Sequence, residues 1–82
     1  MFRRMAPKHR TPEKIRLQSL LKEIRLNSGL TQTEMATRLG RPQSYVSKYE
    51  IGERKLDFLE LREICRVAGI SSIDFARQFE DK

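Results

Sequence analysis

Five hydrogen-bonding side chains lie within six residues near the middle of the 82-residue sequence: Gln43, Ser44, Tyr45, Ser47 and Lys48. On a helix, with about 100° of rotation per residue, they gather on one side, with the glutamine and the tyrosine at its flanks. Amides, hydroxyls and an ammonium group in such a row can hydrogen-bond the base edges of duplex DNA. The alternative is a merely solvated face, which glutamate and alanine would serve better by helix propensity. The pattern therefore favours recognition of bases.

The opposite side of this stretch is suited to packing in a core. Val46, Tyr49 and Glu50 group there. Ala36, in the preceding segment, is small enough to let a neighbouring helix pack closely; the alternative is that it is an ordinary helix former. We interpret the stretch as a helix with one face toward the core and one toward a partner.

Catalysis and metal binding have little support in the sequence. Only one histidine, His9, and one cysteine, Cys65, are present. Cys65 falls in an apolar helical stripe, so we interpret it as a small core residue. One cysteine and one histidine do not make a zinc site of the usual kind, and no glycine-rich phosphate loop follows a strand. We therefore expect neither an enzyme nor a bound cofactor.

The charge of the chain is basic and unevenly distributed. The net charge is +6, of which residues 1–16 carry +5, residues 17–49 carry +3 and residues 50–82 carry −2. A positive balance of this size on a small domain points to a polyanion, most often nucleic acid. Residues 1–10 have no helical periodicity, and we interpret them as a flexible basic arm that contacts phosphates. A solvated end without a partner is the alternative.

The rest of the chain, residues 11–82, is expected to form one all-α domain, a compact five-helix bundle. The expected helices cover about 12–28, 32–39 and 43–50, and two more start at Asp57 and Ser71. Capping residues mark these starts, and glycines mark the ends. The last two helices carry these apolar sets: Phe58, Leu59, Leu61, Ile64, Cys65 and Ala68, then Ile73, Phe75, Ala76 and Phe79. No apolar run approaches the length of about 18 residues that a membrane span needs, and we expect a cytoplasmic protein.

Two of these segments resemble a known family. The residues LTQTEMATRLG, from Leu30 to Gly40, and QSYVSKYE, from Gln43 to Glu50, are similar to the second and third helices of the Cro and phage-repressor (XRE-like) helix-turn-helix regulators. The resemblance covers roughly residues 17–76 and implies a lambda-repressor-like DNA-binding fold. Two positions depart from the family pattern: Ile51 stands where asparagine is common, and Pro42 where a serine or threonine cap is common.

The resemblance implies a role for several individual residues. Gln43, Ser44 and Lys48 match positions that contact bases, and Tyr45 and Ser47 share their face. Gln32, Arg54 and Lys55 match positions that contact DNA phosphates. Arg25 and Glu50 match a pair that forms a salt bridge between the first and third helices, so we predict a buried ion pair here.

Together these observations predict a sequence-specific, double-stranded DNA-binding transcription regulator, a repressor or a controller protein. It would bind a palindromic operator as a homodimer, because one small module reads too few base pairs alone. Ile73, Phe75 and Phe79 are the candidates for the shared apolar surface, and their completing the core is the alternative. The competing hypothesis is an antitoxin-like interaction module that binds a partner protein through its last two helices, since one fold serves both roles.

Overall fold

The computed structural model describes residues 11–81, which contain five helices and no strand. These helices are α1 (Pro12–Asn27), α2 (Gln32–Leu39), α3 (Gln43–Glu50), α4 (Phe58–Ala68) and α5 (Ser72–Glu80). The bounds agree with the sequence-based expectation, except that α1 ends one residue early, where Ser28 is the C-cap. The expected arm at residues 1–10 lies outside the described residues. Within residues 11–81, no helix has the length and apolar character needed to cross a bilayer.

The helix starts are fixed by short-range polar contacts. Thr31 accepts a hydrogen bond from the Glu34 amide at 3.0 Å, and the Glu34 carboxylate accepts one from the Thr31 amide at 2.9 Å. Asp57 and Glu60 form the same reciprocal capping box at the start of α4. The bonds from Thr31 hold the pKa of Glu34 below its ordinary value. The chain can leave α2 at a sharp angle because Gly40 adopts the left-handed conformation, with φ of 71°.

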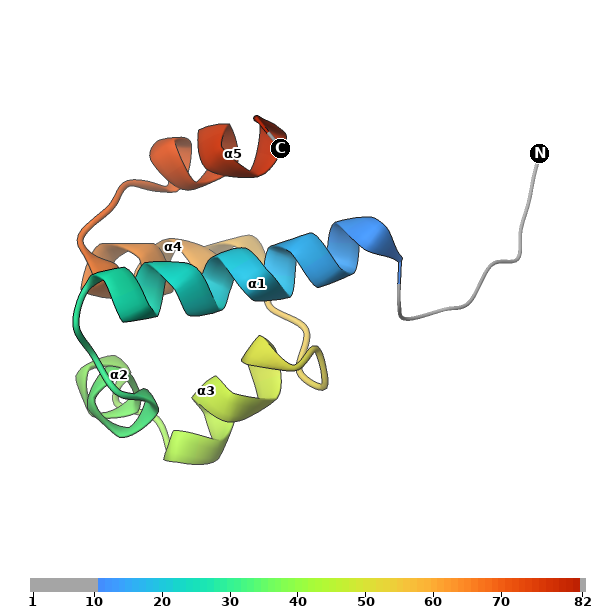
Figure 1. Ribbon diagram of the computed structural model, residues 1–82. Helices are drawn as coiled ribbons and strands as arrows, with labels where there is room; N and C mark the ends of the chain where they lie inside the picture. Colours follow the sequence, from blue (N-terminus) through green and yellow to red (C-terminus); the bar gives the residue numbers. More distant parts are fainter. Residues whose placement is uncertain (1–10, 82) are drawn as a thin grey trace.

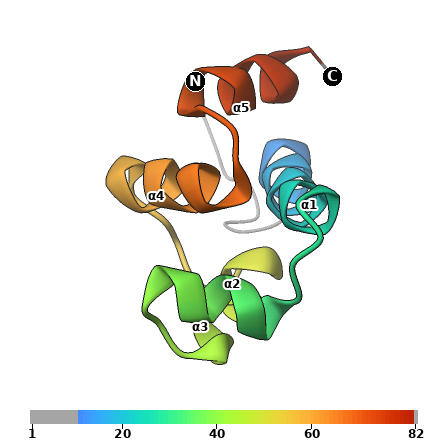
Figure 2. The ribbon, with the colours of Figure 1, turned by 90° about the vertical axis from the view of Figure 1, so that its left-hand side faces the viewer.

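The helices lie at three levels (Figure 1). α1 and α4 occupy the middle level, side by side in the view of Figure 2, with α5 on one side of them and α2 and α3 on the other. The α2–α3 pair therefore forms one end of the molecule. This arrangement leaves the outer side of α3 uncovered by any other described helix.

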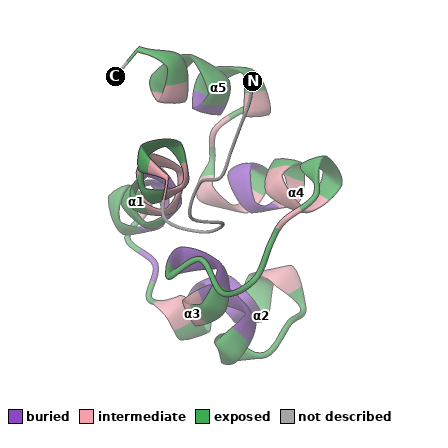
Figure 3. Ribbon diagram, turned by 90° about the vertical axis from the view of Figure 1, so that its right-hand side faces the viewer, coloured by how far each residue is buried: buried purple, intermediate pink, exposed green. Residues whose placement is uncertain are grey.

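The core lies between these levels, where the inner faces of the helices are buried (Figure 3). Its largest fully buried side chains are Leu21, Met35, Val46, Tyr49, Ile64 and Cys65. Leu20, Ile24 and Phe75 extend it along α1 and α5. The two middle helices thus share one core with the helices on both sides of them.

Some members of the apolar sets of α4 and α5 are exposed. Phe58 and Leu59 are 63% and 71% exposed. They are the first two residues of α4, whose first turn reaches the edge of the molecule in Figure 2, beyond the neighbouring helices. Ile73, in the first turn of α5, is 69% exposed, whereas Phe75 is buried. The helical period gives the direction of each side chain but not whether another helix lies opposite it.

Candidate nucleic-acid interface

Helices α2 and α3 pack against each other across a turn of three residues, 40–42. Ala36 and Val46 are both buried in the core. The Arg41 amide donates to the Ala36 carbonyl oxygen at 2.9 Å and closes the end of α2. Pro42 is the N-cap of α3 and offers no side-chain cap, as its residue type requires. The turn nevertheless leads directly into a helix that begins at Gln43.

The outer face of α3 presents small and polar groups. Gln43, Ser44 and Lys48 are exposed, and Ser47 is half-buried. The Ser47 hydroxyl donates to the Ser44 carbonyl oxygen at 3.2 Å, within the helix. Four of the five expected base-contact residues therefore lie on one accessible surface.

Tyr45 is the exception, and the expectation that it faces outward is wrong. It is buried, and its ring meets that of Tyr49 edge-on, with 5.5 Å between ring centroids. The guanidinium groups of Arg41 and Arg54 lie 4.6 and 4.9 Å from its ring centroid. Burial raises the pKa of the Tyr45 hydroxyl. The two arginines come from the segments on either side of α3, so the angular position of Tyr45 on the helix does not reveal that they cover it.

Arg54 is held by an acidic neighbour. Its guanidinium donates to Glu60 at 2.7 Å, and Arg41 lies 3.9 Å from the same carboxylate oxygen. Backbone donation from Asp57, together with Arg54, lowers the pKa of Glu60. The carboxylate balances one of the two guanidinium charges, so the group keeps a net positive charge. Lys55 follows directly and is exposed.

The expected ion pair between α1 and α3 is present. Arg25 Nε donates to Glu50 Oε2 at 2.7 Å, and a terminal guanidinium nitrogen donates to Oε1 at 3.1 Å. A further nitrogen donates to the Leu30 carbonyl oxygen at 2.9 Å. Arg25 and Glu50 are 6% and 7% exposed, so both charges are buried and paired. The hydrogen bonds that Arg25 donates to the Glu50 carboxylate raise the pKa of Arg25.

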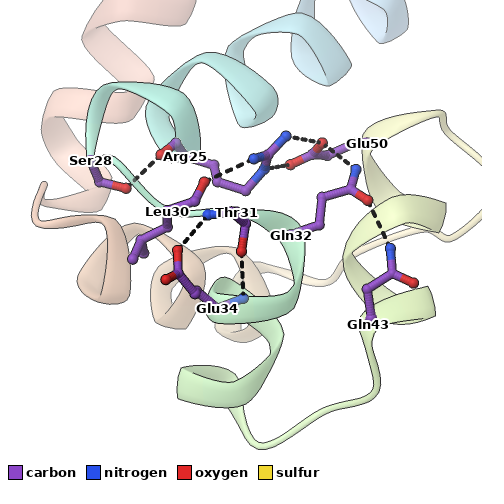
Figure 4. A network of polar contacts seen from close by, with 8 residues as sticks. All are labelled: Arg25, Ser28, Leu30, Thr31, Gln32, Glu34, Gln43 and Glu50. Carbon is purple, nitrogen blue, oxygen red and sulfur yellow. Dashed lines mark hydrogen bonds and ion pairs between the residues drawn. The ribbon is translucent and has the colours of Figure 1, made fainter.

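This ion pair continues as a chain of hydrogen bonds toward the outer face (Figure 4). Gln32 Nε2 donates to Glu50 Oε1 at 3.0 Å, and Gln43 Nε2 donates to Gln32 Oε1 at 2.8 Å. We call Arg25, Glu50, Gln32 and Gln43 the polar relay. It joins a buried charge to the first side chain of α3, so the position of Gln43 depends on the core.

Gln32 therefore has a structural role, linking Glu50 to Gln43, besides the phosphate contact that the resemblance implies. Its side-chain oxygen and one amide hydrogen are engaged in the polar relay. The amide group has a second hydrogen that can be donated to an external acceptor. The side chain is half-buried at the start of α2, where the free amides of a helix N-terminus favour an anion.

Sequence reasoning missed two features of this surface. The first is the pairing of the two glutamines, for which the only signal was that each begins a short helix. The second is Arg41, an exposed cation in the turn between α2 and α3. Its position immediately before Pro42 marked a turn but gave no indication that it lies against Tyr45.

The comparisons with known proteins agree with this geometry. Residues 21–75 match the model of a helix-turn-helix family. An XRE-family like protein from Pseudomonas syringae pv. tomato str. DC3000 is 43% identical; the match covers 84% of each chain, with a TM-score of 0.78. None of the curated proteins searched matches the chain.

Two further solved structures share the fold at lower identity. The restriction-modification controller protein C.Esp1396I, solved as a tetramer with its natural 35 base-pair operator, is 24% identical; the match covers 88% of this chain and 95% of that one, with a TM-score of 0.78. The clp gene regulator ClgR from C. glutamicum is 23% identical; the match covers 94% of this chain and 96% of that one, with a TM-score of 0.76.

Proposed function

The chain belongs to the helix-turn-helix family, and from this premise we propose that it regulates transcription by binding one sequence of duplex DNA in the major groove. The observation that supports this proposal is the exposed polar face of α3, whose first side chain, Gln43, is linked by the polar relay to the buried ion pair. Binding alone would exclude other proteins from the DNA, so a repressor or a controller protein acting in the cytoplasm needs no catalytic step.

Within this proposal, the residues divide into two groups. Gln43, Ser44, Ser47 and Lys48 contact base edges, where a glutamine amide can pair with adenine and an ammonium group can donate to guanine. Gln32, Arg54 and Lys55 contact the phosphates and fix the orientation of α3 in the groove. The position of Arg54 beside Glu60 supports this role, because the carboxylate restrains the guanidinium.

We also propose that two copies bind one palindromic operator as a homodimer. Half-sites one helical turn apart, about 34 Å, are the usual spacing for such modules. The C.Esp1396I structure is a tetramer on its operator, which supports an oligomer on DNA. Of the three candidate residues for the shared surface, Ile73 is exposed, Phe75 is buried, and Phe79 is half-buried with the Arg16 guanidinium over its ring.

Selection of bound fragments from random duplex DNA tests the proposed function. Enrichment of one palindromic motif, with two copies of the chain bound to each fragment, is the expected result. Recovery of fragments without a common motif would contradict sequence-specific binding. A single copy bound to a non-repeated motif would contradict the homodimer alone.

A further inference from the structure

A cleft of about 440 Å³ lies between α1 and the loop that follows α3. This volume is within the range of small-molecule sites, which combine apolar walls with a few polar groups. Leu17 and Leu21 of α1 and Leu56 of the loop provide apolar wall. The cleft is separate from the outer face of α3, because none of the proposed base-contact residues lines it.

Tyr49 supplies the first polar group. Its side chain lines the cleft, yet the residue is only 1% exposed, and its buried hydroxyl has no hydrogen-bond partner among residues 11–81. A buried hydroxyl without a partner is costly, and it gains most from an acceptor that reaches it. A carboxylate or carbonyl oxygen in the cleft becomes such an acceptor when a small shift of the cleft wall uncovers the hydroxyl, which has less than 1 Å² of accessible surface.

Gln18 supplies a second polar group on the same wall. A Cβ built at Gly52 would come within 2.2 Å of Gln18 Nε2, so the amide lies directly against the glycine. Gly52 also has a φ of 85°, which favours glycine at this position. The absence of a side chain there leaves room for the glutamine amide beside the cleft.

The charge around the cleft is positive. Lys14, Arg54 and Lys55 contribute to its lining, with the Arg54 guanidinium also paired with Glu60 outside the cleft, and none of the described lining residues is acidic. Cationic and apolar walls together complement a small anion that has an apolar body. Two of the three cations also belong to the residues that we propose for phosphate contact.

We propose that this cleft binds a small organic carboxylate with an apolar body, and that its binding weakens the hold of Arg54 and Lys55 on DNA. The carboxylate lies near the cations and accepts a hydrogen bond from Tyr49, and the apolar body lies against the three leucines. The bound anion competes with the DNA phosphates for the same cations. The regulatory half of this proposal, that the bound carboxylate weakens DNA binding, rests on the proposed function. The binding half, that the cleft binds the carboxylate, does not.

The binding half is tested on the free protein, without DNA. 3-Phenylpropionate, an aromatic carboxylate, is titrated while the backbone amide signals are followed by NMR. For a probe of this size we expect a dissociation constant of about 1 mM. The largest shifts should fall on the loop residues 52–56, and the neutral 3-phenylpropanamide should bind more weakly.

Three variants make this test specific. Tyr49→Phe removes only the hydroxyl and should weaken binding about three- to tenfold, the range of one hydrogen bond. Lys55→Gln should also weaken it, whereas Lys22→Gln, which removes an exposed charge of α1 outside the cleft, should not. Shifts that do not saturate or that spread over the whole surface would overturn the proposal. Equal affinity in all three variants would do so as well.

The regulatory half is tested with random duplex DNA. Saturating 3-phenylpropionate should weaken DNA binding about two- to tenfold, as expected for the loss of two exposed phosphate contacts. The amide at the same concentration should leave the affinity unchanged. An unchanged affinity with the cleft occupied would overturn the antagonism. If the chain bound no DNA at all, the proposed function would fail while the NMR titration still decided the site.

Discussion

At the scale of single residues, the buried ion pair has the largest consequence for stability. Glu50→Gln leaves the Arg25 charge buried without a counter-charge, which should lower the free energy of unfolding by about 3–5 kcal/mol. Urea denaturation measures this loss. The control is Glu53→Gln, which removes an exposed carboxylate and should change stability by less than about 0.5 kcal/mol. Equal stability of the two variants would contradict the assignment.

Replacing both partners of the ion pair should be far less damaging. Arg25→Met combined with Glu50→Leu removes both charges and leaves no buried unpaired charge, so much of the lost stability should return, although the Leu30 carbonyl loses its donor. The same double variant still lacks the acceptor for Gln32. We therefore expect it to fold but to bind its specific DNA site more weakly than the wild type.

The outer face of α3 should control sequence preference with little effect on stability. Gln43→Ala and Lys48→Ala should each lose about 1–3 kcal/mol of binding to the selected site, because each removes a base contact. Binding to random duplex and the thermal midpoint should change little, since both side chains are exposed. Titrations of both duplexes and a melting curve measure these effects. Equal losses on specific and random DNA would show that α3 does not read the sequence.

The buried thiol of Cys65 makes stability depend on alkaline pH. Burial raises its pKa to about 11, whereas a thiol in the unfolded chain titrates near pH 8.5. The folded state therefore binds more protons between these values, and stability that is complete below about pH 8.5 is lost as the pH rises through about 11. The Cys65→Ala variant has no thiol to titrate, so its stability should not fall in this way. The difference in stability between the wild type and this variant should therefore become smaller from about pH 8.5 to about pH 11. Urea midpoints at a series of pH values measure the difference; a constant deficit would contradict it.

At the scale of the helices, each N-cap makes its own contribution to the free energy of unfolding, which can be measured separately. Asp57→Ala removes the acceptor of the Glu60 amide, a bond of 2.8 Å, and should lower stability by about 1 kcal/mol. Asp57→Asn keeps an acceptor oxygen and should cost much less. Urea denaturation of the pair tests this assignment. If both variants lost the same amount, the negative charge rather than the hydrogen bond would be responsible.

These same caps explain why the helices could be predicted from the sequence. A cap involves residues only three positions apart, so Thr31 with Glu34, or Asp57 with Glu60, contains the complete local signal. The position of Tyr45 could not be predicted in this way, because Arg41 and Arg54 cover it from outside its helix. The polar relay could not be predicted either, because its residues lie on three helices that meet only in the folded structure.

At the scale of the whole molecule, the charge of residues 1–10 leads to a prediction that rests on sequence alone. Deleting these residues removes four basic side chains, and it should weaken binding to all duplexes alike. The salt dependence should become less steep, because each neutralised phosphate contributes about 0.9 to the logarithmic slope. Affinities measured over a series of salt concentrations give this slope. An unchanged slope would show that these residues make no phosphate contact.

Because the N-caps are formed by residues close together in the sequence, they also affect how fast the chain folds after synthesis. Four of the five helices begin with a cap formed by their own neighbouring residues, so much of the structure needs no distant contact to start. Small helical domains with such local contacts fold within milliseconds or less. Synthesis of 82 residues takes about 4 to 16 s at ordinary translation rates. The rate of synthesis, not of folding, then sets the supply of folded protein, so a change in transcription of its gene changes that supply without a delay from folding.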